Sequence, residues 1–139
     1  MSVAEIAERV NLTSTPCWRR IQKLEAEGYI RGRVALLDRQ KLGLGVTVLI
    51  AVRTNQHSIE WLTRFHAAVS TMPEVVDFIR LSGEIDYMIR VVVPDIRSFD
   101  AFYKRLIGKI ELYDVSSMFA MEEIKTTTEL PLDYLPVRG

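Results

Sequence analysis

The stretch from residue 14 to residue 33 carries side chains of the kind that nucleic-acid recognition requires. It holds five basic residues and two acidic ones, namely Arg19, Arg20, Lys23, Arg31 and Arg33 with Glu25 and Glu27. If this stretch starts a helix, five side chains near the helix N-terminus are expected to reach base edges: Ser14, Thr15, Trp18, Arg19 and Gln22. Arginine pairs with guanine and glutamine with adenine. Lys23, Arg31 and Arg33 lie farther along and are expected to contact phosphates, which sets register rather than sequence preference.

The same residues allow a second interpretation. In it, Arg19, Arg20 and Lys23 form an ordinary solvated helix face and Trp18 packs against a neighbouring domain. Amphipathic helices with a polar, charged outer side are common among proteins of every function. The whole chain has 18 Lys plus Arg and 18 Asp plus Glu, so its net charge favours neither interpretation. This stretch alone leaves both open.

A second candidate site is the sequence GEIDY, residues 83–87. Glu84 and Asp86 are expected beside a tight turn whose backbone N–H groups could approach a ligand closely. Carboxylates and free N–H groups together suit the ammonium and the carboxylate of an amino acid, because both ends must be paired when they are buried. An ordinary β-hairpin turn has a similar composition, so the turn is open to both interpretations.

Other chemistry finds little support in the sequence. Cys17 is the single cysteine, and His57 and His66 have no further ligands at metal-binding spacing. We find no nucleophile beside a base and no phosphate-binding loop, so we expect no catalytic residues, no metal and no cofactor. The longest apolar runs are too short to cross a bilayer and no secretion signal opens the chain, so we expect a cytoplasmic protein without a membrane partner.

The elements that must position these side chains follow from the spacing of apolar residues. Residues 2–10 predict a short helix that starts with a capping box. A second helix is expected to begin after Thr15, with Pro16 in its first position, and to end at Gly28. The segment YIRGRVALL, residues 29–37, predicts a pair of strands or a wing. Two helices joined by a short polar turn predict a helix-turn-helix unit.

After residue 37 the pattern changes. Residues 38–45 predict a linker between a first domain at residues 1–37, which the helix-turn-helix pattern marks as a candidate for DNA binding, and a second domain at residues 46–139, for which the family resemblance described below implies ligand binding and oligomerisation. Strands are expected at 46–54, 74–82, 86–93 and 114–128, and helices at 58–72 and 95–109. The order β-α-β-β-α-β is that of a ferredoxin-like domain, so the predicted fold class is α+β.

These motifs resemble those of the Lrp/AsnC family of bacterial and archaeal transcription regulators. AEIAERVNLTSTPCWRRIQKLEAEGYI is similar to the family's winged helix-turn-helix, and LDRQKLG is similar to its linker. GEIDYMIRV resembles the central signature of the family's effector domain, and FAMEEIK resembles its last strand. Family members usually have one more helix before residue 2, so we expect a truncated helix-turn-helix.

The resemblance implies a sequence-specific DNA-binding transcription regulator whose assembly or DNA binding responds to a small effector, an amino acid in many members. It implies double-stranded DNA as a partner and a homodimer, formed through the sheet, that assembles further to an octamer. It places DNA contact on the residues named above, and an effector site at Gly83, Glu84, Asp86 and Tyr87 with Glu122 nearby. The alternative is a stand-alone amino-acid-binding or enzymatic ferredoxin-like dimer that does not bind DNA.

Overall fold

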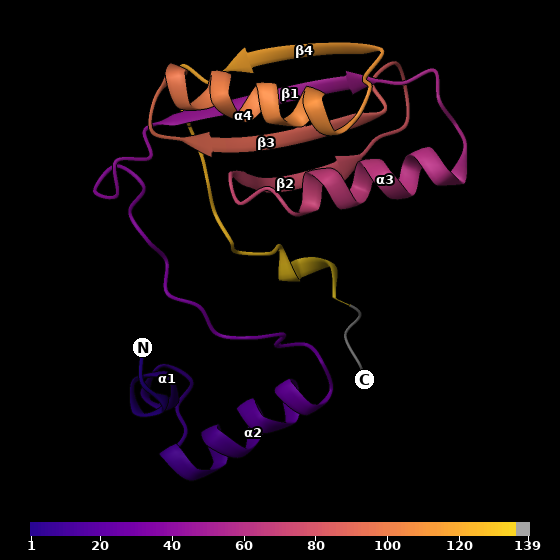
Figure 1. The fold of residues 1–139 in the computed structure, drawn as a ribbon. Coiled ribbons are helices and arrows are strands. Elements are labelled where there is room, and N and C mark those ends of the chain that lie inside the picture. The colour runs from indigo at the N-terminus through magenta and orange to yellow at the C-terminus, as the bar shows by residue number, and fades with distance from the viewer. Residues whose placement is uncertain (136–139) are drawn as a thin grey trace. The chain divides into compact units, whose positions relative to one another are not determined.

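The structure of the chain, a computed structural model, describes residues 1–135 (Figure 1). The chain divides into two units, the first ending at Leu37 and the second beginning at Asp38. The first unit contains the helices α1 (Val3–Arg9) and α2 (Ser14–Ala26). The second unit contains the sheet and the remaining helices.

Both helices of the first unit begin with recognisable local signals. The predicted capping box of α1 is present: the Ser2 hydroxyl accepts a hydrogen bond from the N–H of Glu5, and the Glu5 carboxylate accepts one from the N–H of Ser2. α2 begins at Ser14, so Pro16 is its third residue and not its first as predicted. Proline is tolerated there because the first N–H groups of a helix have no partner within it. Ala7 and Cys17 are the buried residues of the two helices.

The segment after α2 differs from the sequence-based expectation. Gly28 has a φ of 77°, in the left-handed region that favours glycine, and the N–H of Ile30 bonds back to the carbonyl of Leu24 at 3.1 Å. Beyond this helix end, residues 31–37 form no strand, so the predicted strand pair is wrong. An isolated two-stranded hairpin is marginal in water, and two short helices offer no sheet edge on which it could pair.

The second unit is built on one antiparallel sheet. Its elements are β1 (Val46–Arg53), α3 (Ile59–Ser70), β2 (Val75–Arg80), β3 (Tyr87–Val93), α4 (Ile96–Lys109), β4 (Asp114–Phe119) and the 3-10 helix η1 (Leu132–Tyr134). The strands lie in the order β2-β3-β1-β4 and every neighbouring pair is antiparallel. This is the predicted ferredoxin-like arrangement, which confirms the α+β fold class.

Both α3 and α4 lie along the same face of the sheet (Figure 1). Phe65 from α3 and Phe102 from α4 are fully buried in the core. They pack over the central strands, where Ile50 of β1 and Ile89 of β3 are direct partners in the register and are also fully buried. Because side chains alternate along a strand, the residues between these core positions point to the other face.

That other face, here called the open face, is covered by neither α3 nor α4. It is formed by Thr47, Leu49 and Ala51 of β1, Met88 and Arg90 of β3, Met118 of β4 and Ile79 of β2. Ile79 is 50% exposed and Met118 is 44% exposed. The sheet thus presents partly apolar surface that another molecule can cover.

β4 is shorter than predicted. The expected strand at residues 114–128 stops at Phe119, and residues 121–131 have no regular structure. β4 pairs with β1 alone, and the N–H of Ala120 makes the last bond of this edge, to the carbonyl of Thr47 at 2.9 Å. β1 begins at Val46, so the chain beyond Ala120 has no strand left to pair with.

Candidate DNA-binding and effector sites

The outward side of α2 carries the side chains that were expected to contact bases. Ser14, Thr15, Trp18, Arg19 and Gln22 are all exposed. Trp18 is 51% exposed, whereas the adjacent Cys17 is 3% exposed and belongs to the buried side of the helix. A helix that buries Cys17 on one side and leaves a polar and basic side uncovered can present that side to the major groove.

Of the three residues assigned to phosphates, Lys23 and Arg33 each lie beside a glutamate. Lys23 is exposed and its ammonium is 3.7 Å from the Glu27 carboxylate. Arg31 is exposed, and Arg33 places its Nη2 2.7 Å from Oε1 of Glu25. Gln22 donates from Nε2 to the other Glu25 oxygen at 2.8 Å. No role for Glu25 was predicted from the sequence, although its position three residues after Gln22 places both on one side of the helix.

The GEIDY turn closes the hairpin between β2 and β3. Gly83 has a φ of 125°, and the N–H of Leu81 bonds to the carbonyl of Asp86 at 2.8 Å. The Asp86 carboxylate accepts the N–H of Thr54 at 2.8 Å, and the N–H of Asp86 bonds to the carbonyl of Val52 at 3.0 Å. Asp86 therefore ties the turn to the end of β1, and one of its carboxylate oxygens is engaged by the fold itself.

Arg53, the last residue of β1, lies between two carboxylates beside this turn. Its guanidinium is 3.7 Å from Glu84 and 3.7 Å from Asp114. Arg53, Asp114 and Met118 also line a hollow of about 380 Å³. Neither Arg53 nor Asp114 was predicted from the sequence, because the β1–β4 register that makes them partners joins strands far apart in the chain.

Tyr87, predicted to line the effector site, is 2% exposed and belongs to the core of the second unit. Its hydroxyl is 3.4 Å from Nε2 of His66. With Phe78 and Arg80, these two residues line a hollow of about 220 Å³. Arg80 and Tyr87 are direct partners in the β2–β3 register just before the turn, so this hollow adjoins GEIDY.

From the sequence, Glu122 is expected near the GEIDY turn. Within one chain, Glu122 lies away from that turn. Ala120 is bonded to Thr47 at the start of β1, whereas Asp86 is bonded to Val52 at the other end of the same strand. Five residues of strand at about 3.3 Å each put about 17 Å between these two points. Glu122 lines hollows at the start of β1 with its neighbour Glu123.

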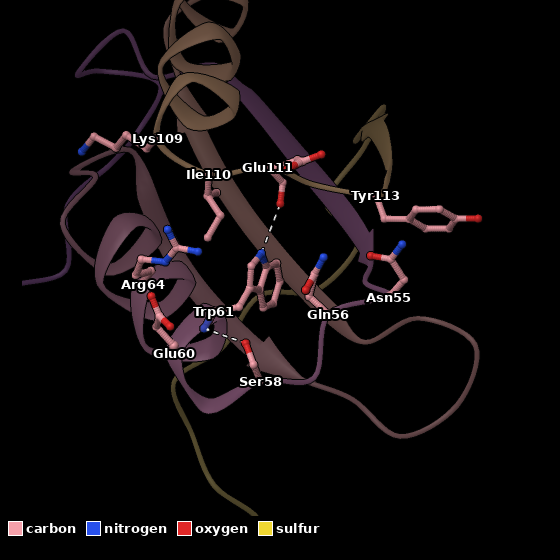
Figure 2. Close-up of a pocket in the computed structure, with 10 residues that line it drawn as sticks. All are labelled: Asn55, Gln56, Ser58, Glu60, Trp61, Arg64, Lys109, Ile110, Glu111 and Tyr113. Atoms are coloured by element: carbon pink, nitrogen blue, oxygen red, sulfur yellow. Dashed lines mark hydrogen bonds between the residues drawn. The ribbon is translucent and has the colours of Figure 1, made fainter.

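Another hollow, of about 290 Å³, lies between the loops that follow β1 and α4 (Figure 2). Its wall is the indole of Trp61, whose N–H donates to the carbonyl of Glu111 at 3.3 Å. Four charged residues line it, Glu60, Arg64, Lys109 and Glu111, and their charges balance. Because the indole donor is already engaged and no charge predominates, this hollow favours no particular ligand.

The linker is fixed to the sheet by three side chains. The Arg39 guanidinium is 2.9 Å from the Glu123 carboxylate, and the Thr47 hydroxyl donates to the same carboxylate at 3.0 Å. The hydrogen bond from Thr47, followed by the charge of Arg39, holds the pKa of Glu123 below its ordinary value of 4.5. This cluster joins the linker, β1 and the segment after β4.

Two further properties concern the described residues only. Among residues 1–135, no helix is both long enough and apolar enough to cross a membrane. Within the same range, no three His, Cys, Asp or Glu side chains come together as a metal ion would require.

Comparison with known proteins gives matches to both units. Residues 47–130 match the Lrp/AsnC ligand binding domain, and residues 1–31 match a winged helix-turn-helix DNA-binding domain. The chain is 51% identical to the DNA-binding transcriptional activator DecR of Escherichia coli over 134 residues, which cover 96% of this chain and 88% of DecR.

Two solved structures share the fold along nearly the whole chain. An AsnC family transcriptional regulator from Agrobacterium tumefaciens matches with a TM-score of 0.93 and 63% identity, covering 97% of this chain and 88% of that one. A transcriptional regulator from Neisseria meningitidis, solved as a complex with L-Met, matches with a TM-score of 0.91 and 34% identity at the same coverage.

Proposed function

The chain belongs to the Lrp/AsnC family of transcription regulators, and we propose that it binds double-stranded DNA through α2 and responds to an amino acid bound at the GEIDY end of its sheet. The observation that carries the proposal is the exposed face of α2. Trp18, Arg19 and Gln22 are uncovered on that face, in a unit that matches a DNA-binding domain.

DNA binding is tested by selecting duplexes from a random library with the full chain, and by gel shift on the DNA upstream of its own gene. We expect a preferred sequence and an affinity that falls steeply with salt, because phosphate contacts release counterions. A variant with Arg19 and Gln22 both changed to alanine should keep salt-dependent binding but lose the preference. Wild-type protein that enriches no sequence would contradict the proposal.

The proposed effector site is supported by the charges around Arg53. A free amino acid carries an ammonium and a carboxylate on one carbon, and each must be paired when it leaves water. Arg53 offers a cation for the carboxylate, while Glu84 and Asp114, each 3.7 Å from it, offer anions for the ammonium. We therefore add Arg53 and Asp114 to the four turn residues Gly83, Glu84, Asp86 and Tyr87. The relative from Neisseria meningitidis holds L-Met, so methionine is the first compound to test.

Assembly is the third part of the proposal. The Glu84 side chain is 92% exposed, so one turn alone does not exclude water from a ligand. We propose that a second subunit completes the site, and that Glu122 reaches it from that subunit, because within one chain it lies at the opposite end of the sheet. A dimer formed through the open face, assembling further to an octamer, would provide such neighbours.

The effector site is tested by titrating the common amino acids while heat and sedimentation are followed together. Binding and assembly should favour each other by the same factor, because linkage is reciprocal. Glu84→Ala and Asp114→Ala should weaken binding of the amino acid. In these variants, assembly should no longer depend on the amino acid. Glu60→Ala is the matched control, since Glu60 is an exposed glutamate at the hollow of Figure 2. Unchanged affinity in both variants would remove the site from this turn.

A further inference from the structure

Glu25 is an acidic residue in the last turn of α2, on the side of the helix that is proposed to face DNA. Its carboxylate accepts two hydrogen bonds from residues assigned to DNA contact. Gln22 donates from Nε2 to Oε2 at 2.8 Å, and Arg33 donates from Nη2 to Oε1 at 2.7 Å. The Glu25 side chain is 32% exposed, whereas that of Arg33 is 61% exposed. The acid is thus partly covered by the groups that it holds.

The bond to Glu25 fixes which way the Gln22 amide points. An ionised carboxylate only accepts hydrogen bonds, so the NH2 group of Gln22 must face Glu25 and its carbonyl oxygen must face away. The NH2 group has two hydrogens, and one of them is engaged. The second hydrogen and the carbonyl oxygen are left free, and these are the donor and the acceptor with which glutamine pairs with adenine.

The same carboxylate holds Arg33. Residues 31–37 form no strand, so no sheet positions Arg33 against α2. The ion pair to Glu25 provides that link at 2.7 Å. A guanidinium has five N–H donors, so Arg33 keeps donors for a DNA phosphate while one of them is bound to Glu25.

We propose that Glu25 is a positioning residue for DNA recognition, which orients the Gln22 amide toward an adenine and holds Arg33 beside the DNA backbone. The inference rests on the proposed DNA-binding face of α2. Simple electrostatics predicts the opposite result for removal of this acid. A carboxylate near phosphates repels DNA, so its loss should tighten binding to every sequence. The direction of the effect therefore separates positioning from repulsion.

The experiment compares full-length variants on three duplexes: one selected by the wild type, one altered at the base pair where Gln22→Ala loses its preference, and one unselected. The variants are Glu25→Ala, Glu25→Gln, Gln22→Ala and Arg33→Ala. Glu8→Ala is the matched control, because Glu8 is an exposed glutamate of α1 and its loss changes the charge of the same unit by the same amount. Thermal melting of each variant checks that the first unit is folded.

We expect Glu25→Ala to lower the preference at that base pair by about fivefold or more, the lower end of the range for one bidentate pair. Glu25→Gln keeps one acceptor oxygen, so its preference should fall between those of Glu25→Ala and wild type. In a Gln22→Ala background, Glu25→Ala should change the preference no further, because the two residues act together. Glu8→Ala should leave the preference unchanged.

Two results would overturn the inference. One is tighter binding of Glu25→Ala to all three duplexes with unchanged preference, which would make Glu25 a repulsive charge only. The other is a loss of preference that is just as large in the Gln22→Ala background. If the wild type selects no duplex, the DNA-binding face itself fails. If Gln22→Ala and Arg33→Ala weaken recognition and Glu25→Ala does not, the face stands and this inference alone fails.

Discussion

The two units of the chain differ in what stabilises each of them. In residues 1–37, Ala7 and Cys17 are the fully covered apolar residues, whereas the second unit buries a continuous core between its two helices and the sheet. A unit of fewer than about 40 residues buries too little apolar surface to be robust by itself. Local features such as the capping box at Ser2 therefore carry more of the first unit's stability, and tertiary packing carries that of the second.

The largest expected effect is on the second unit. Phe102 is fully buried between α4 and the sheet, so Phe102→Ala should destabilise this unit by about 3–5 kcal/mol. The chain has one tryptophan in each unit, Trp18 and Trp61. Urea titrations of variants that keep only one tryptophan report on one unit at a time. We expect the urea midpoint reported by Trp61 to fall and the midpoint reported by Trp18 to stay unchanged.

The control for this measurement is Ile59→Ala. Ile59 is 82% exposed, so its substitution should change stability by no more than about 0.5 kcal/mol. If Phe102→Ala moved the Trp18 transition as far as the Trp61 transition, the two units would unfold together and the contrast between them would be lost.

The next largest effect concerns the surface of the first unit. Arg19→Ala and Gln22→Ala should each cost about 1–3 kcal/mol of discrimination at one base pair. Lys23→Ala should instead weaken binding to all sequences and reduce the salt dependence by about one counterion. Fluorescence anisotropy on selected and unselected duplexes at several salt concentrations measures both. Equal behaviour of Gln22→Ala and Lys23→Ala would show that base and phosphate contacts are assigned wrongly.

A smaller effect compares the same substitution in both units. Ser2 caps α1 and Ser58 caps α3, each by accepting a backbone N–H three residues on. Either serine changed to alanine should cost about 1 kcal/mol. We expect Ser2→Ala to fray α1 in hydrogen exchange, because little packing holds that helix. Ser58→Ala should leave α3 protected, since Phe65 anchors it in the core. Equal fraying of both helices would contradict the contrast.

The smallest effect is a dependence on pH at the linker cluster. Glu123 has a pKa below 4.5 in the folded chain, owing to Thr47 and then Arg39, so the folded state binds this proton more weakly than the unfolded state. The resulting stabilisation is present above about pH 4.5 and is lost as the pH falls through the folded pKa. For such a partly exposed pair we expect at most about 1 kcal/mol. The melting difference between wild type and Glu123→Gln should shrink from pH 7 to pH 3.

Local signals in the sequence were sufficient for much of the fold. The capping box at Ser2 and the turn at Gly28 depend on residues a few positions apart. The order of strands and helices along the chain follows from the alternation of strand and helix patterns. The strand expected at 114–128 was too long because its end depends on where β1 begins, which its own residues do not encode. The strand pair predicted at 29–37 failed for a related reason, since strands need a partner.

The sites divide in the same way. Arg19 and Gln22 could be proposed from the sequence because one helix presents them together. Arg53 and Asp114 could not be proposed from the sequence, because the register between two distant strands brings them together. Glu122 lies at the other end of the sheet from the turn within one chain, and its part in the effector site stays a prediction, since similarity of a motif does not fix its distance from another motif. Tertiary register is thus the information that single-sequence patterns lack.

Residues 31–37 act as a tether of limited reach. No backbone–backbone hydrogen bond holds them in the part of the chain that the structure describes, while Arg39 is pinned to the sheet side by Glu123. Fully extended, this tether spans at most about 25 Å, so two of them together can span the roughly 34 Å between half-sites one turn of DNA apart. In the proposed dimer, two such tethers would let each α2 adjust to its own half-site over a bounded range of spacings. Inserted residues in this tether should widen that range.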